Sequence, residues 1–369
     1  MIDKSKITGA QFLFTIACFL QSSTIITSFF VKISLHDSFI VILTGFVVIL
    51  PVLFMFLYIM KSFSGRNLIQ INDIVFGKIL GKLISFFYLF FFISLCSLNL
   101  GDMGNFVINT FMIKTPISVI IILFMILCVW AVRNGLHVVT RYNIFLSLLI
   151  TIAIIIDTIL VFNLFNLQNF LPFFDLSIKR YIHATHTIAT IPFGEVLVIL
   201  MIIPNVKLDH KKIKKYFFIG FLIGVISLLI VVFREIAVLG DALALFSFPS
   251  FETIKLIDLG TSFNRLEIIF AFVLVMLFFS KVVLLLYVTV IAFAQIFNLT
   301  SFKAYVLSIG IIIIVYTLNI YPSAMKHDFA GSNIHPVHWT LIEIILPFIT
   351  FIIILIKNSI KKGHQANDR

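Results

Sequence analysis

The chain places a proline, a glycine and a carboxylate together inside one apolar run, at Pro192-Phe193-Gly194-Glu195. Pro192 has no N–H to donate to the carbonyl of Ile188, and Gly194 disfavours helix through its backbone entropy. Hydrocarbon cannot satisfy the backbone groups that such a break frees, so the break must face protein or water. A carboxylate such as Glu195 at mid-depth costs about 2.5–3.5 kcal/mol on insertion scales. The combination therefore indicates a functional site.

The composition predicts a membrane protein. Hydrophobic residues make up 61% of the 369 residues and mean hydropathy is +1.17. Charged residues make up 12%, against about 25% in soluble proteins. The three cysteines, Cys18, Cys96 and Cys128, all lie in apolar runs and imply no disulfide framework. Because no small-residue cleavage site follows Lys4 and Lys6, we expect a retained first span.

A window of about 20 residues divides the chain into ten expected transmembrane helices. They cover 8–30, 37–60, 84–112, 116–132, 142–163, 185–204, 213–235, 266–297, 301–321 and 339–357. The fold class is therefore an all-α polytopic membrane protein. We expect one transmembrane domain over 1–369, with a polar cytoplasmic tail at 358–369.

The distribution of Lys and Arg predicts the orientation. With both termini in the cytoplasm, the inner segments hold 18 of the 27 Lys and Arg residues and the outer segments hold 8, with Arg234 counted as outer. Lys281 falls inside a span. The net charge of +11 then faces the anionic inner leaflet, so a nucleic-acid partner is not required.

The first span carries a second candidate break. Four hydrogen-bonding side chains, Gln21-Ser22-Ser23-Thr24, interrupt it at mid-depth. Span 6 comes five spans after span 1, which is an odd number, so the two spans cross the membrane in opposite directions. This predicts two inverted five-helix repeats, at about 8–163 and 185–357, with broken helices 1 and 6 and a substrate site between them. The alternative for span 1 is an intact, slightly bent helix whose hydroxyls bond to its own carbonyls.

Two connections are expected to be structured. The segment 67–82 alternates apolar and polar residues at helical spacing, which predicts a short amphipathic helix on the cytoplasmic face. The outer segment 237–265 is too long and too apolar for a solvated coil, so we expect it to fold back as a lid over the outer mouth.

The chain resembles the spore germination permease family, the B subunits of GerA-type nutrient germinant receptors, within the amino acid–polyamine–organocation transporter superfamily. The segments that carry the resemblance are Lys4–Gln11, Thr115-Pro116 with Asn134-Gly135-Leu136 and Arg141, Pro192–Glu195 with Pro204, Phe248–Phe251, Arg265-Leu266-Glu267 and Phe279-Ser280-Lys281. One difference is in span 1, where many relatives have a glycine-rich break and this chain has Gln21–Thr24.

The resemblance implies a sensor that retains a transporter fold of the LeuT type. It would bind a small nutrient, typically an amino acid, at mid-membrane and signal to an A and a C subunit in the inner membrane of the spore. A proton-coupled amino acid symporter that acts alone uses the same fold and pocket and stays as the alternative. No catalytic constellation occurs in the sequence, so we expect neither an enzyme nor a cofactor.

The candidate ligand-binding residues surround the two breaks, where unpaired N–H groups of a half-helix suit a carboxylate. They are Gln21, Ser22, Ser23, Thr24, Thr190, Phe193, Gly194 and Glu195. The alternative for the hydroxyl groups is interhelical hydrogen bonding. For Glu195 the alternatives are a ligand ammonium, a proton or an ion pair with Lys281, which lies deep in span 8.

Other polar residues are expected at wetted positions. Asp102, Asp157 and Glu343 lie toward the outer ends of their spans, so we interpret them as solvated. The pairs His183/His186 and His335/His338 have spacing that permits metal binding, but no third ligand is near in sequence, so no metal site is predicted.

Overall fold

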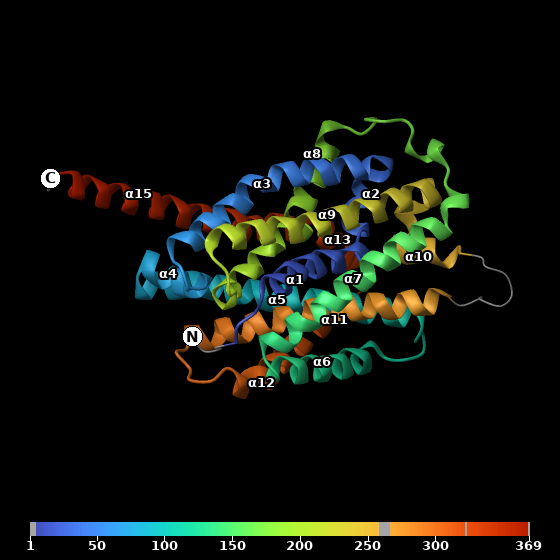
Figure 1. The fold of residues 1–369 in the computed structure, drawn as a ribbon. Helices are drawn as coiled ribbons and strands as arrows, with labels where there is room; N and C mark the ends of the chain where they lie inside the picture. The colour runs from blue at the N-terminus through green and yellow to red at the C-terminus, as the bar shows by residue number, and fades with distance from the viewer. Residues whose placement is uncertain (1–4, 258–265, 322, 368–369) are drawn as a thin grey trace.

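The computed structural model describes residues 5–257, 266–321 and 323–367. Lys4, Arg265 and Arg369 lie outside these ranges. Within the described residues the chain is a bundle of helices, most of which run side by side along one direction (Figure 1).

The bundle contains the ten expected spans. Eight helices of the described chain are long and apolar enough to cross a membrane, and shorter apolar helices cover Gly9–Ile25 and Ile117–Arg133. The first five spans are α1 (Gly9–Gln21) continued by η1 (Ser22–Ile25) and α2 (Ser28–Ser34), then α3 (Ser38–Ser62), α5 (Lys78–Thr110), α6 (Ile117–Arg133) and α7 (Leu136–Leu160). The last five are α8 (Ile178–Ile188) continued by η5 (Ala189–Phe193) and η6 (Gly194–Met201), then α9 (His210–Leu239), α11 (Leu266–Ile296), α12 (Val306–Ile320) and α14 (His335–Thr340) continued by η11 (Leu341–Ile345) and α15 (Leu346–Asn367).

Three short helices lie in the connections, and they are α4 (Leu68–Phe76), α10 (Pro249–Lys255) and α13 (Ala324–Asn333). The helix α4 is the expected amphipathic helix. The described part of the expected lid contains η8 (Gly240–Leu245) and α10, and it buries Leu243, Phe251 and Ile254. The helix α10 contacts α9, α11 and the 3₁₀ turn η1 of span 1, so this connection does fold back onto the bundle.

Several spans are longer than hydropathy predicts. Span 3 begins at residue 78 rather than 84, span 6 at 178 rather than 185, and span 10 at 335 rather than 339. The helix α15 also continues to Asn367, through most of the polar tail. Hydropathy marks the apolar part of a helix, whereas the backbone hydrogen-bond ladder continues until a cap or a breaker ends it.

Local sequence signals set several helix ends. Thr8 and Gln11 form a capping box at the start of α1, and Asn67 and Gln70 form one at the start of α4. Gly77 separates α4 from α5 with φ of +82°, a left-handed conformation that suits glycine.

Small residues bring α9 close to span 1. Gly220 and Gly224 are spaced four apart on one face of α9 and lie against Leu13 and Leu20 of α1. A Cβ at either glycine would overlap that helix, so the spacing permits the close backbone approach common between membrane helices. The start of span 1 is fixed as well, because Ile7 pairs with the end of span 6 through a 2.9 Å hydrogen bond from its N–H to the carbonyl of Asn205.

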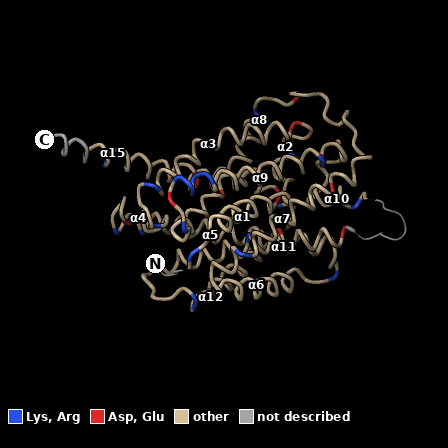
Figure 2. The backbone as a smooth tube through the Cα atoms, viewed as in Figure 1, with Lys and Arg blue, Asp and Glu red and all other residues tan. Residues whose placement is uncertain are grey.

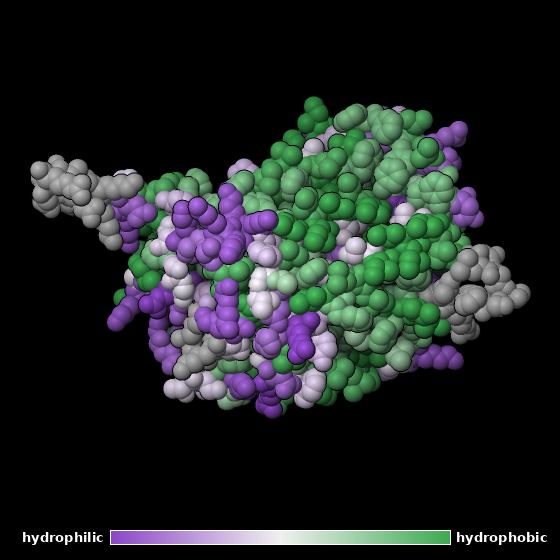
Figure 3. Space-filling view, viewed as in Figure 1, coloured by the Kyte–Doolittle hydropathy of each residue, from purple (hydrophilic) through white to green (hydrophobic). Residues whose placement is uncertain are grey.

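Basic residues gather at one end of the molecule. Figure 2 shows Lys and Arg concentrated where α4 and the start of α9 lie, and Figure 1 shows α1 beginning and α15 ending toward that same end. Apolar side chains cover a broad band of the visible surface, with hydrophilic side chains gathered toward the basic end (Figure 3). Exposed Phe, Leu and Ile side chains in such a band are suited to lipid contact.

Candidate functional site

Span 1 is interrupted within the membrane-spanning bundle. After Gln21 the α-helix tightens into the 3₁₀ turn of η1, and Ile26 has the non-helical angles φ −102° and ψ 35°. The hydroxyl of Ser22 donates to the carbonyl of Phe19 at 2.6 Å, and the hydroxyl of Thr24 donates to that of Gln21 at 2.7 Å. Such local bonds compete with the regular helix ladder, and the helix resumes only at α2.

Span 6 is interrupted beside Pro192. Ile191 has φ −113° and ψ 109°, an extended conformation between two helical pieces. The proline ring disfavours α-helix at the preceding residue, and its missing N–H removes one ladder bond. The chain continues as the 3₁₀ segment η6, which begins at Gly194 and is fully buried. Both expected breaks are therefore present.

A buried ion pair joins the two breaks to span 8. Lys281 Nζ lies 2.7 Å from Glu195 Oε2, and Lys281 also donates to Ser23 Oγ at 3.0 Å. Its ammonium sits 4.8 Å from the centroid of the Phe19 ring. Glu195 and Lys281 are each 1% exposed. The two opposite charges therefore form a buried ion pair.

Glu343 is a further carboxyl group at this site, and the expectation that it is solvated is wrong. It is fully buried in η11 of span 10, and its Oε2 occupies the space where Gly194 would carry a Cβ. Neither of its carboxyl oxygens has a hydrogen-bond partner among the described residues. Pro347, four residues further on, cannot donate to the Glu343 carbonyl, which accounts for the wider π turn here.

The misplacement of Glu343 came from the expected span boundary. With span 10 beginning at 339, Glu343 appeared one turn from its end, whereas the helix begins at His335. The sequence does contain a signal for a buried carboxyl group here. Glu343 and Pro347 lie together inside an apolar run, as Pro192 and Glu195 do in span 6.

Gln21 crosslinks neighbouring spans. Its Nε2 donates to Thr151 Oγ1 at 2.9 Å and to Ser227 Oγ at 3.1 Å, and its Oε1 accepts from Ser147 at 2.8 Å. Both ends of the amide are therefore engaged with spans 5 and 7.

Thr190 and Phe193, the remaining candidate residues of span 6, contact protein groups rather than the ion pair. The hydroxyl of Thr190 bonds to the carbonyl of His186 at 2.9 Å, and Phe193 packs on Phe221 with ring centroids 5.4 Å apart. The structure thus brings Ser23 and Glu195 together with Lys281 and places Gly194 against Glu343. The hydroxyls of Ser22, Thr24 and Thr190 bond within their own spans.

The interpretation of Asp102 and Asp157 as solvated is wrong. Asp102 is 6% exposed and its Oδ1 lies 3.4 Å from His327 Nδ1 of α13. Asp157 is 4% exposed and its Oδ2 lies 3.3 Å from Arg234 Nη1. Arg234 is itself buried within α9 rather than placed in an outer segment, and it also contacts Ser250 of α10. The short helices α10 and α13 cover these groups, and hydropathy does not reveal them.

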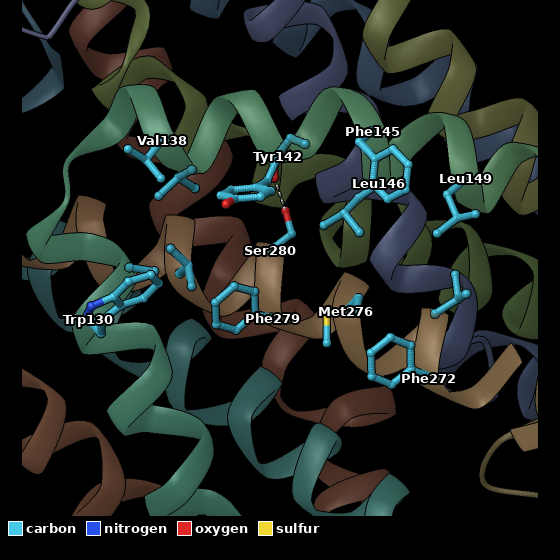
Figure 4. A pocket seen from close by; sticks show the side chains of 15 residues that line it. Trp130, Val138, Tyr142, Phe145, Leu146, Leu149, Phe272, Met276, Phe279 and Ser280 are labelled. Atoms are coloured by element: carbon cyan, nitrogen blue, oxygen red, sulfur yellow. Dashed lines mark hydrogen bonds between the residues drawn. The ribbon is translucent and has the colours of Figure 1, made fainter. Parts of the chain in front are cut away.

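An apolar cavity of about 340 Å³ lies beside the site, between α6, α7 and α11 (Figure 4). Its rim includes Trp130 and Phe272, which are exposed on the outside of the bundle. At its inner wall Ser280, the residue before Lys281, donates to Asn143 Oδ1 at 2.6 Å. The cavity therefore reaches Ser280 of α11 from the apolar surface of the bundle.

Comparison with known proteins defines the family. A family model described as spore germination protein matches residues 6–325. The chain belongs to the spore germination protein family. As a member of this family, it is 28% identical to spore germination protein KB of Bacillus subtilis (strain 168) over 374 residues, which is 99% of this chain and 100% of the relative. Spore germination protein B2 of the same organism is 24% identical over 181 residues, 49% of this chain and 48% of the relative.

Solved structures of similar shape show the fold of this chain. MHP1, a nucleobase-cation-symport-1 family transporter in a closed conformation with bromovinylhydantoin bound, has a TM-score of 0.63 at 15% identity, covering 89% of this chain and 75% of the transporter. MhsT in complex with L-phenylalanine has a TM-score of 0.59 at 16% identity, and the match covers 93% of this chain and 97% of MhsT. The family resemblance and the LeuT-type fold are both confirmed, and the chain is a multi-pass membrane protein.

Proposed function

We propose that this chain is the nutrient-sensing subunit of a spore germinant receptor, with its ligand site at the breaks of spans 1 and 6. The observation that carries the proposal is the contact of Lys281 with both breaks, through Ser23 and Glu195. A charged cluster buried between two interrupted helices is expensive to maintain, and function is the usual reason to keep it.

An amino acid is the nutrient class that this chemistry favours. Unpaired backbone N–H groups at a helix break suit its carboxylate, and the carboxylate of Glu195 suits its ammonium. The rearrangement of span 6 around the ligand would then be passed to A and C subunits in the inner membrane of the spore. Both termini and the basic end of the bundle would face the cytoplasm, as the positive-inside rule expects.

The experiment uses spores in which this chain, with its own A and C subunits, is the only nutrient receptor. A panel of amino acids and sugars is applied, and release of dipicolinate is measured. The proposal expects a response to at least one amino acid, and co-purification of both partner subunits with this chain. Spores that ignore the whole panel, or a chain that purifies alone, would contradict it.

A proton-coupled amino acid symporter is the second candidate. It is favoured by the buried carboxyl of Glu343, which has no hydrogen-bond partner in the described part of the chain. Uptake of labelled amino acid into proteoliposomes, driven by a pH gradient, separates the two functions. A sensor shows no accumulation beyond binding stoichiometry, whereas a symporter accumulates substrate over many turnovers.

A further inference from the structure

The central site of spans 1, 6, 8 and 10 contains two carboxyl groups near one ammonium group. Lys281 is committed to Glu195, Ser23 and the Phe19 ring. Glu343 is fully buried and neither of its oxygens has a hydrogen-bond partner in the described chain. The ammonium group of Lys281 is therefore already paired with the carboxylate of Glu195.

An ionised Glu343 would be costly in this position. Removing a carboxylate from water without a partner or hydrogen bonds is strongly unfavourable, and a group in that situation takes up a proton instead. The negative charge of Glu195, on the segment η6 that packs against η11, adds repulsion to this cost.

The other elements packed against η11 offer no compensation. The charged and titratable groups on these elements include Lys78, Lys82, Tyr88 and Asp102 of α5, His335 and His338 of α14, and Lys357 of α15. Within the described chain none of these groups forms a hydrogen bond or an ion pair with Glu343. Charge compensation among these groups thus reduces to Lys281, which already pairs with Glu195.

We propose that Glu343 is a proton-binding site of this protein, protonated in the closed arrangement described here. When Gly194 moves away and water enters, the O–H bond breaks, its electrons stay on the carboxyl oxygen and the proton passes to water. The contact of Glu343 with Gly194 makes this exchange sensitive to the conformation of span 6. The inference goes beyond the proposed nutrient site, because a proton on Glu343 requires no nutrient.

Infrared spectroscopy of the full chain in lipid nanodiscs at neutral pH tests the proposal. A protonated carboxylic acid has its own carbonyl stretching band, distinct from that of a carboxylate. The expected result is loss of one such component in Glu343→Gln and no loss in the control Glu252→Gln, whose carboxylate pairs with Lys255 at the surface. Identical spectra for wild type and Glu343→Gln in this region would overturn the proposal.

Thermal unfolding of the same two variants gives a second readout. An amide has nearly the size of a protonated carboxyl and carries no charge, so Glu343→Gln is expected to melt within a few degrees of wild type. A variant that fails to fold or melts far lower would show that the site needs a charge at this position, which also contradicts the proposal.

Discussion

Gly194 lies directly against the Glu343 carboxyl: a Cβ at position 194 would overlap sterically with the Oε2 atom of Glu343. The break in span 6 and the π turn in span 10 are therefore fitted to one another. Any movement of span 6 at the break changes the surroundings of Glu343, and any side chain at position 194 displaces it.

Substitution of Gly194 tests this fit. We expect Gly194→Ala to impair the nutrient response strongly, and Gly194→Leu to abolish it, while the protein stays in the membrane. Gly101→Ala is the matched control, because a Cβ there would meet Thr317 Cγ2 at an ordinary 3.5 Å. Dose–response curves and membrane abundance are measured together, and an unchanged curve for Gly194→Leu would place the ligand elsewhere.

The Glu195–Lys281 ion pair predicts that substitutions at these two positions have non-additive effects on stability. Glu195→Gln and Lys281→Met each leave one uncompensated buried charge, which costs about 3–5 kcal/mol, whereas replacing both partners can be nearly neutral. The double variant should therefore recover abundance and melting temperature beyond the additive expectation. If the two losses simply add, the side chains do not depend on each other.

The buried contact of Arg234 with Asp157 predicts a second pair of energetically coupled residues, near α10. Arg234→Met leaves the Asp157 carboxyl buried without its cation and is expected to lower stability by about 3–5 kcal/mol. The double variant with Asp157→Asn should recover most of it. Lys255→Met is the control, because its pair with Glu252 is partly exposed and is worth under about 1 kcal/mol. Equal effects of the Arg234 and Lys255 substitutions on thermal melting would contradict this account.

The expected orientation of the chain in the membrane predicts which introduced cysteines can be labelled from outside the cell. Cysteines at Lys211, in the basic start of α9, should resist a membrane-impermeant maleimide in whole cells, while cysteines at Lys255 of α10 should react. The native cysteines are buried and give little background. Labelling of the Lys211 position from outside would reverse the topology.

The sequence predicted those features that depend on depth and backbone chemistry. The number of spans, the break at Pro192 and the candidate pairing of Glu195 with Lys281 all follow from apolar length, a missing N–H and the cost of buried charge. Features that depend on which helix covers which group were not predictable from one sequence. Asp157 appeared solvated because nothing local indicates that Arg234 faces it from another span.

Gln21 illustrates the same limit on a smaller scale. Its polar amide at mid-depth is compatible with a ligand contact and with a crosslink between helices. The choice depends on Ser147 and Ser227, which lie more than a hundred residues away in sequence. Span 1 likewise could have stayed an intact helix, and tertiary packing of α10 and α11 against η1 accompanies its break.

The most direct test of the central claim is ligand-induced stabilisation of the purified chain. Wild type and the Glu195→Gln/Lys281→Met double variant are melted in nanodiscs with each amino acid, because a ligand that binds the folded state raises the melting temperature. The account predicts that at least one amino acid stabilises wild type and has no effect on the double variant. Equal stabilisation of both proteins, or none in wild type with the whole set, would contradict a ligand site at the two helix breaks.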